Sequence, residues 1–433
     1  MVRLALAIAV VVVFGILWRR KVRELPPRLR SAADVVEVVA LVGLVGVVAV
    51  LAYRNVVTPS PWDFPVFYTV GRNAVEGLSF YDPVALLPTF EEIQRTAGVP
   101  ADWLGDGFGF WYAPQTALVL APVGVSSYTT GLVLQYLIQG ALFVVTIVVV
   151  HSAFPLRPGV MGLVEMGVLF FAFGPVIQAF ALAQIVFGAL LFLALAYTTV
   201  VDRPFIAGVL LGVGAVFKHL LVIPAVLLMI MGKARATLGA LVAIAASSVV
   251  AAAVFGPGVF SEFVTFGPRD RPPEIALDPV IVSLNGFLRR LLDAVPTDGG
   301  AVASIMYPPY IVAAALLTGG TAWLVWRGRR DAGTTLLSFS LITLLMLLVY
   351  PNTLFNTLPL MIPAMVVLVS MADRLAFPPS VTVAVVTCVY VLTVTDAVPG
   401  IVAMILMWTY LALCVARSTD TASTTLAPQV ATP

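Results

Sequence analysis

Hydrophobic stretches constrain this chain more than any other feature. Thirteen of them run through the 433 residues, and two long polar segments, 54–128 and 256–308, interrupt them. A stretch of about 20 apolar residues can cross roughly 30 Å of hydrocarbon as a helix, which satisfies its backbone hydrogen bonds internally. With 61% hydrophobic and 11% charged residues, the chain has too much apolar surface for a soluble protein. We therefore expect an all-α polytopic membrane protein with about 11 to 13 transmembrane helices and two long outward-facing loops.

The spacing of these stretches predicts how the chain is organised. An N-terminal anchor and the first spans occupy 1–53, an outer loop 54–128, membrane helices 129–255, a second outer loop 256–308, and further membrane helices 309–417. Within the first block of membrane helices, 205–231 is too short for two full spans and predicts two half-length helices that turn back at Lys218-His219. The tail 418–433 is rich in Thr, Ala and Pro, which predicts disorder.

Basic residues predict the orientation in the membrane. If the loop Arg19–Arg30 is cytoplasmic and the spans alternate, 15 of the 24 Lys and Arg residues fall on the cytoplasmic side, mostly in short loops. Both long polar segments then face outward. The sequence thus predicts a multi-pass protein of the cell membrane whose functional loops are extracytoplasmic.

Several classes of function are disfavoured by composition. The two cysteines, Cys388 and Cys414, both fall inside predicted spans, and the chain has only two histidines, so we expect neither a disulfide framework nor a metal site. A net charge of +2 and the lack of an exposed basic tract argue against a nucleic-acid partner. We expect no cofactor, and a monomer in the lipid bilayer.

The first polar segment contains the principal catalytic candidate, Asp63. An acidic residue just outside a membrane helix, in a loop rich in aromatic residues, is where a membrane enzyme acting on lipid-linked substrates would keep a base. An amphipathic helix on the membrane surface is predicted to begin after Asp63 and to end near Gly77, with apolar residues at Phe64, Phe67, Val70, Ala74 and Leu78. A carboxylate at a helix start can also be a simple N-cap, so both interpretations stay open.

Other polar and aromatic residues near the predicted outer face also have two interpretations. Aromatic residues where the chain re-enters the membrane can form an interfacial belt or can pack against sugar rings and polyprenyl chains; these are Phe108, Phe110, Trp111 and Tyr112. Arginines of the second polar segment can clamp a phosphate, or can contact lipid headgroups and neighbouring acids; these are Arg269, Arg271, Arg289 and Arg290.

Lys218 and His219 lie in the middle of an apolar hairpin. A buried cation in a membrane protein is costly unless it is paired or faces a polar cavity, so it indicates a functional site. We expect Lys218 to face the same cavity as Asp63, the alternative being a structural pair with a buried carboxylate such as Glu165.

The order of several short motifs resembles a known family. They are the Trp-Asp-Phe at 62–64, the Gly-x-x-x-Tyr-Asp at 77–82, "WYAP" before "LAPVG", "LAQIVFGALL" at 182–191, "AGVLLGVGAVFKH" at 207–219 and "SLNGFLRRL" at 283–291. Together they are similar to the GT-C glycosyltransferases, and most to family 87, the polyprenol-phosphate-mannose-dependent mannosyltransferases and their relatives. Ala183 and His219 stand where the family usually has Gly and Pro. The histidine that often follows a late span is absent, and "YPNTLFNTLP" offers Asn352 and Asn356 instead.

The resemblance implies a function and a set of site residues. It implies an inverting transfer of a sugar, mannose by analogy, from a polyprenyl-phosphate donor to a lipid-linked or cell-envelope glycan acceptor, with Asp63 as the base and no metal. Together with the residues already singled out above, the expected substrate-binding set is Tyr68, Tyr81, Asp82, Trp111, Tyr112, Gln184, Lys218, His219, Arg269, Arg271, Asn285, Arg289 and Asn356. The alternative is a lipid or glycolipid transporter or flippase, which would need repeat halves and polar groups near mid-membrane.

Overall fold

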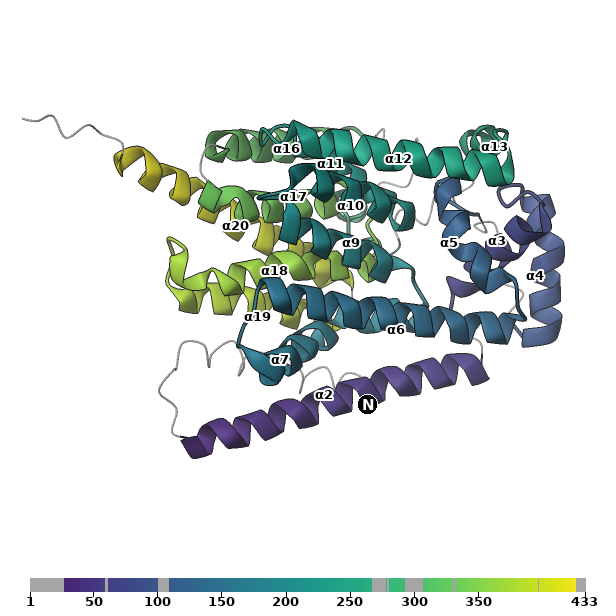
Figure 1. The fold of residues 1–433 in the computed structure, drawn as a ribbon, viewed down its shortest axis with the longest axis horizontal. Coiled ribbons are helices and arrows are strands. Elements are labelled where there is room, and N and C mark those ends of the chain that lie inside the picture. The colour runs from purple at the N-terminus through teal and green to yellow at the C-terminus, as the bar shows by residue number, and fades with distance from the viewer. Residues whose placement is uncertain are drawn as a thin grey trace, which may run out of the picture.

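The computed structural model describes residues 27–58, 61–99, 109–266, 278, 280–292, 307–329, 332–395 and 397–425. Throughout these residues the secondary structure is helical, apart from an isolated bridge between Ile281 and Leu354. The long helices run side by side along the longest axis of the molecule (Figure 1). The predicted all-α class is confirmed.

Four of the described helices are long and apolar enough to cross a membrane alone: α6 (Tyr128–Ala153), α12 (Ala234–Phe255), α16 (Pro308–Gly328) and residues 400–418 of α20 (Ala397–Thr425). A fifth span arises if α7 (Gly159–Ala172) and α8 (Gly174–Ala181), which are bent by 70° at their junction, are counted together.

The remaining apolar helices are shorter. They are α9 (Val186–Thr199), α10 (Pro204–Phe217), α17 (Thr335–Val349), α18 (Ile362–Ser370) with the 3-10 helix η5 (Phe355–Met361) before it, α19 (Pro379–Thr395) and the apolar part of α2 (Pro27–Val57). Fewer described helices than the expected 11 to 13 are therefore long enough to span alone, because breaks at proline, glycine and Lys218 divide the apolar stretches. The first predicted span, 4–18, lies outside the described residues.

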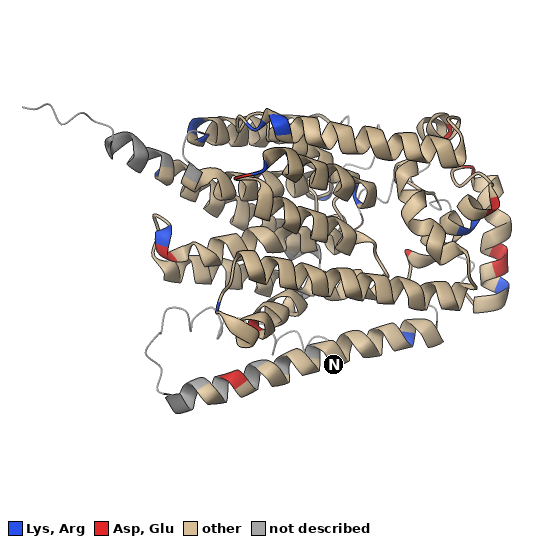
Figure 2. Cartoon of the chain, in the orientation of Figure 1, with Lys and Arg blue, Asp and Glu red and all other residues tan. Residues whose placement is uncertain are grey.

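Charged residues gather toward the two ends of the helix bundle, and its middle is largely uncharged (Figure 2). This distribution is that of a polytopic membrane protein. The predicted disordered tail is partly wrong: α20 continues as a helix to Thr425, and 426–433 lies outside the described residues.

Small residues bring the central helices close together. A side chain at Gly208 of α10 would lie 1.7 Å from the Ala236 carbonyl oxygen of α12, and one at Gly239 of α12 would lie 2.2 Å from the Phe205 carbonyl oxygen. Backbone-to-backbone packing of this kind is what glycine permits in membrane helices. The helix α10 ends at Phe217, and the predicted break follows at Lys218.

The first polar segment forms three helices at one end of the bundle (Figure 1): α3 (Phe64–Glu76), α4 (Pro83–Ala97) and α5 (Pro114–Gly124). The predicted bounds of α3 are confirmed, since Gly77 ends it with a left-handed φ of 69°. The apolar side of this helix packs against other helices of the protein. A side chain at Gly71 would lie 2.3 Å from the Leu120 carbonyl oxygen of α5, and Phe64 and Val70 are fully buried.

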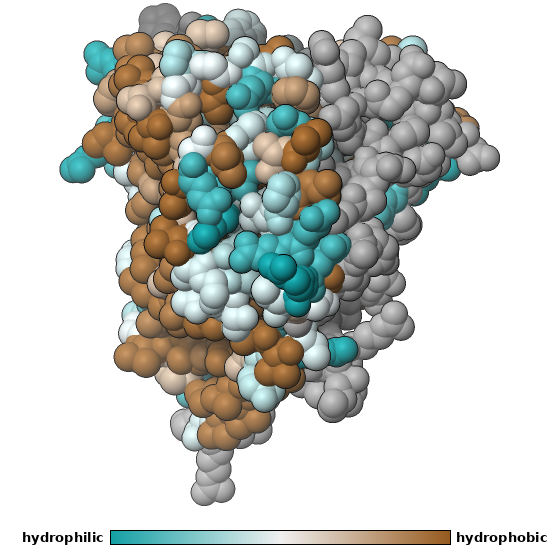
Figure 3. All heavy atoms as spheres, turned by 90° about the vertical axis from the view of Figure 1, so that its right-hand side faces the viewer, coloured by the Kyte–Doolittle hydropathy of each residue, from teal (hydrophilic) through white to brown (hydrophobic). Residues whose placement is uncertain are grey.

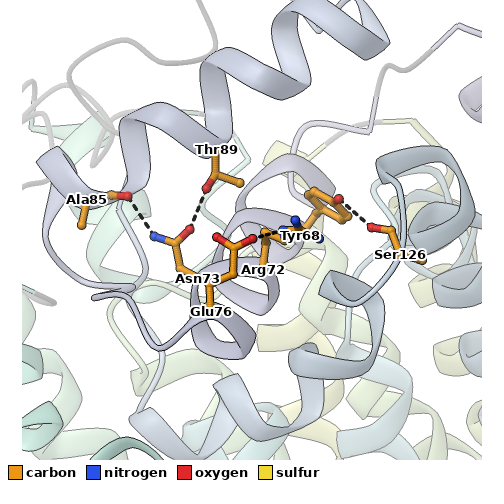
Figure 4. Close-up of polar contacts among 7 residues, drawn as sticks. All are labelled: Tyr68, Arg72, Asn73, Glu76, Ala85, Thr89 and Ser126. Carbon is orange, nitrogen blue, oxygen red and sulfur yellow. Dashed lines mark hydrogen bonds and ion pairs between the residues drawn. The ribbon is translucent and has the colours of Figure 1, made fainter.

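Polar contacts hold α4 against α3 (Figure 4). The buried Asn73 amide donates to the carbonyl oxygens of Ser79 and Ala85, each at 2.9 Å, and accepts a hydrogen bond from Thr89 at 2.7 Å. Arg72 and Glu76 form an ion pair on the more exposed side of α3. Hydrophilic side chains form a patch on this end of the molecule, bordered by hydrophobic ones (Figure 3).

In the described residues of the second polar segment there are two short helices. In α13 (Val259–Phe266), Glu262 accepts a hydrogen bond of 2.6 Å from Ser79, which ties this helix to the first polar segment. The helix α14 (Leu284–Leu291) begins after Ser283, whose hydroxyl donates to the Pro351 carbonyl oxygen. Both polar segments are therefore anchored to the same bundle.

Candidate active site

Asp63 precedes α3 but does not cap it. Its carboxylate makes no capping hydrogen bond, so the N-cap interpretation is wrong, and Asp82 has that role at α4, accepting from the Val84 N–H at 2.9 Å. The Asp63 side chain is partly buried. Loss of water around the carboxylate raises its pKa above the ordinary value, while a hydrogen bond from Gln184 and the positive charge of Lys218 oppose that rise.

Gln184 lies directly against Asp63, although 121 residues separate them. Its side-chain Nε2 donates to Asp63 Oδ2 at 2.5 Å. Gln184 is buried, and its other polar atom, Oε1, has no hydrogen-bond partner among the described residues. The turn between α8 and α9 carries Gln184, and Ala183 within that turn has a left-handed φ of 52°. That conformation explains why glycine suits this position in the family pattern.

Lys218 follows the last residue of α10 and is buried. Its ammonium donates to the Tyr112 hydroxyl at 2.6 Å and lies 4.9 Å from the centre of that ring. It is also close enough to Asp63 for its charge to act on the carboxylate. The alternative partner Glu165 contacts Arg157 instead, at 3.5 Å.

His219, the next residue after Lys218, also lies against Tyr112. Its ring centre is 6.3 Å from that of Tyr112, edge to face, and its Nε2 hydrogen-bonds the Tyr350 hydroxyl. Tyr350 follows the last residue of α17. The contacts from Asp63 to Tyr350 thus join the first polar segment, the α8–α9 turn, the end of α10 and the end of α17.

Buried aromatic residues hold Tyr112 in place. The Tyr81 hydroxyl donates to the Tyr112 carbonyl oxygen at 2.6 Å, and Phe67 of α3 packs edge-on against the Tyr112 ring at 5.9 Å. Tyr81 therefore supports the site through Tyr112. Trp111, the neighbour of Tyr112 in the chain, is partly buried.

The structure gives other expected residues packing or capping contacts. The Tyr68 hydroxyl donates to the Ser126 carbonyl oxygen at 2.7 Å (Figure 4), and its ring packs against Phe64 and Tyr128. Asp82 is the cap of α4. The Tyr68 contacts hold α3 against the start of α6, and the Asp82 contact is local to the start of α4.

The described candidates in the second half of the chain lie on α14 and η5. Arg289 is buried on α14, donates from Nε to Asn285 Oδ1 at 3.1 Å, and lies 4.4 Å from the centre of the Tyr307 ring. Asn356 is buried in η5 and accepts a hydrogen bond from Thr357 at 3.4 Å. The Val282 N–H donates to the Thr353 carbonyl oxygen, which anchors α14 near Tyr350. Arg269 and Arg271 lie outside the described residues.

Two residues of the site were not predicted from sequence. Tyr350 is the partner of His219, and Gln135 of α6 binds the Ala183 carbonyl oxygen at 3.0 Å. A signal existed for Gln135, because a glutamine within an apolar span needs a partner. In the described part of the chain, no three His, Cys, Asp or Glu side chains are grouped closely enough to hold a metal ion.

The fold and this site define a polytopic membrane protein with a carboxylate, a lysine and aromatic side chains brought together where a polar segment meets the helix ends. Comparison with family models matches residues 110–351 to glycosyltransferase family 87. The match covers more than half of the chain, which therefore belongs to glycosyltransferase family 87 and is a membrane glycosyltransferase with the GT-C fold. Neither the curated proteins nor the solved structures include a match.

The matched region contains Gln184, Lys218, His219 and Tyr350, whereas Asp63 precedes it. The hydrogen bond from Gln184 and the charge of Lys218 therefore connect Asp63 to the part of the chain that carries the family likeness.

Proposed function

We propose that this glycosyltransferase transfers a sugar, mannose by family analogy, from a polyprenyl-phosphate donor to a lipid-linked or cell-envelope glycan. The reaction takes place on the extracytoplasmic side and inverts the anomeric centre. Asp63 accepts the proton of the acceptor hydroxyl as that oxygen bonds to the anomeric carbon. The bond from this carbon to the phosphate oxygen breaks in the same displacement, so the polyprenyl phosphate leaves as an anion.

The observation that carries this proposal is a buried cation whose charge acts on a carboxylate, where the first polar segment meets the apolar helices. Asp63 has one oxygen bound by Gln184, which leaves Oδ1 for an acceptor hydroxyl. Lys218 stands near that carboxylate and is hydrogen-bonded to a neutral hydroxyl, that of Tyr112. A positive charge aimed at a departing phosphate stabilises the charge that develops in the transition state.

Further residues are proposed for substrate contacts. Gln184 Oε1, which is buried and lacks a hydrogen bond among the described residues, would accept a hydrogen bond from a substrate hydroxyl. Tyr112, Trp111 and His219 supply aromatic faces for a sugar ring. Arg289 is proposed to contact the donor from α14. A phosphate is already a good leaving group, so this chemistry demands no general acid.

The replacement Asp63→Asn tests the proposal. Asparagine has nearly the same shape but cannot accept a proton at neutral pH, and general-base catalysis contributes about 10²–10⁴-fold. We expect the purified variant to stay folded, to bind a polyprenyl-phosphate-mannose donor, and to lose turnover by that factor. Transfer at a near-normal rate would show that Asp63 is not the base.

A further inference from the structure

The amide nitrogen of Gln184 faces Asp63 Oδ2 at 2.5 Å. This orientation suits the ionised carboxylate, which can only accept a hydrogen bond. Gln184 therefore fixes one carboxylate oxygen and leaves the other free.

The backbone that carries Gln184 is held by other helices. Gln135 of α6 donates to the Ala183 carbonyl oxygen at 3.0 Å, and Asn55 of α2 donates to the Ala181 carbonyl oxygen at 2.6 Å. Asn55 also donates to the Tyr136 hydroxyl of α6 at 2.8 Å. Side chains from two helices thus bind the backbone carbonyls of one tight turn.

These contacts stabilise an unusual backbone conformation. Ala183 is fully buried with a φ of 52°, a region that costs roughly 1–2 kcal/mol for a residue with a Cβ atom. Such a conformation persists only where the surroundings specify it strongly. Without it, the Gln184 side chain would leave the turn in another direction and would not reach Asp63.

We propose that Gln184 is a positioning residue for Asp63. The amide, held by the Ala183 turn and by Gln135, keeps Asp63 Oδ1 aimed at the acceptor hydroxyl. It also stabilises the ionised form that can take a proton. The catalytic part of this inference rests on the proposed base role of Asp63, whereas the contact itself does not.

Two side chains lower the pKa of Asp63 and so favour its ionised form. One is Gln184, and the other is Lys218, whose ammonium is also bound by Tyr112. Of the two, the Gln184 hydrogen bond lowers the pKa of Asp63 more. Removing the amide therefore leaves the burial effect opposed by Lys218 alone, and the pKa of Asp63 must rise.

The test measures the titration of Asp63 by infrared spectroscopy in the purified full-length protein, with no substrate present. The protonated-carboxyl band is assigned to Asp63 by its loss in Asp63→Asn. In Gln184→Met we expect the midpoint of this titration to move upward by about one to two pH units. Gln184→Asn, whose amide is one methylene shorter, should also move it upward and serves if the methionine variant does not fold.

Gln139→Met is the matched control. Gln139 is another buried glutamine, one helical turn after Gln135 on α6, and its amide has no hydrogen bond among the described residues. We expect this variant to leave the midpoint unchanged. An unchanged midpoint in both Gln184 variants, or an equal shift in Gln139→Met, would overturn the proposal.

The two proposals fail in different experiments. If Asp63→Asn still transfers sugar, the base role is wrong, but the titration still decides whether Gln184 controls the carboxylate. If Asp63→Asn is inactive and Gln184→Met leaves the titration unchanged, only the positioning role is wrong.

Discussion

Replacing Lys218 by methionine separates a phosphate-binding role from a structural one. The side chain is 5% exposed, and its ammonium bonds the neutral Tyr112 hydroxyl at 2.6 Å. Its nearby opposite charge is Asp63, which has a second stabilising partner in Gln184. Removing the lysine charge therefore does not leave the Asp63 carboxylate without a stabilising partner.

The expected effect on stability is small because two contributions oppose each other. A hydrogen bond from a charged donor contributes about 1.5–3 kcal/mol, and burying an ammonium costs a comparable or larger amount. Methionine fits an apolar wall without that cost. We expect the free energy of unfolding of Lys218→Met to change by less than about 2 kcal/mol.

The expected effect on the donor is larger. Losing a charge-assisted contact of about 1.5–3 kcal/mol weakens binding by roughly ten- to a hundredfold. Losing a group that stabilises transition-state charge lowers kcat by about 10²–10³-fold. Donor titration, transfer kinetics and thermal unfolding on one purified variant measure all three quantities.

Lys233→Met is the matched control, because Lys233 binds only a backbone carbonyl oxygen among the contacts described, that of Val201 at 3.2 Å. It should leave donor affinity unchanged. A Lys218→Met protein with a lower unfolding temperature and unchanged donor affinity would refute the phosphate role.

Two other predictions concern packing and orientation. In Gly71→Ala the new methyl group would lie 2.3 Å from the Leu120 carbonyl oxygen, so α3 and α5 must separate. We expect the free energy of unfolding, measured by thermal unfolding, to fall by about 1–3 kcal/mol or more. An unchanged stability would contradict this packing. In a Cys388→Ser background, a cysteine that replaces exposed Thr96 should react with an impermeant thiol reagent on intact cells, and one that replaces exposed Arg235 should not. The reason is that loops rich in Lys and Arg favour the cytoplasmic side of the membrane. The reverse labelling pattern would show that the proposed orientation is inverted.

Sequence patterns predicted the local features of the site. The apolar spacing after Asp63 and the glycine at 77 predicted the bounds of α3, because helix periodicity and a left-handed C-terminal residue depend on neighbours in the chain. The break at Lys218 was predicted from length, because 205–231 is too short for two full spans. The motif order predicted the family, which the match over residues 110–351 confirms.

The sequence by itself determined the all-helical membrane class and the ends of several helices, since these follow from composition and local spacing. Tertiary structure decided that α3 packs against α5 and that the Asp63 side chain makes no capping hydrogen bond to α3. It also decided that Gln184 hydrogen-bonds Asp63, although 121 residues separate them in the chain. These outcomes depend on which helix faces touch, and that is set by close packing at residues such as Gly71 and by the turn at Ala183. No pattern within one segment specifies the distance to another segment.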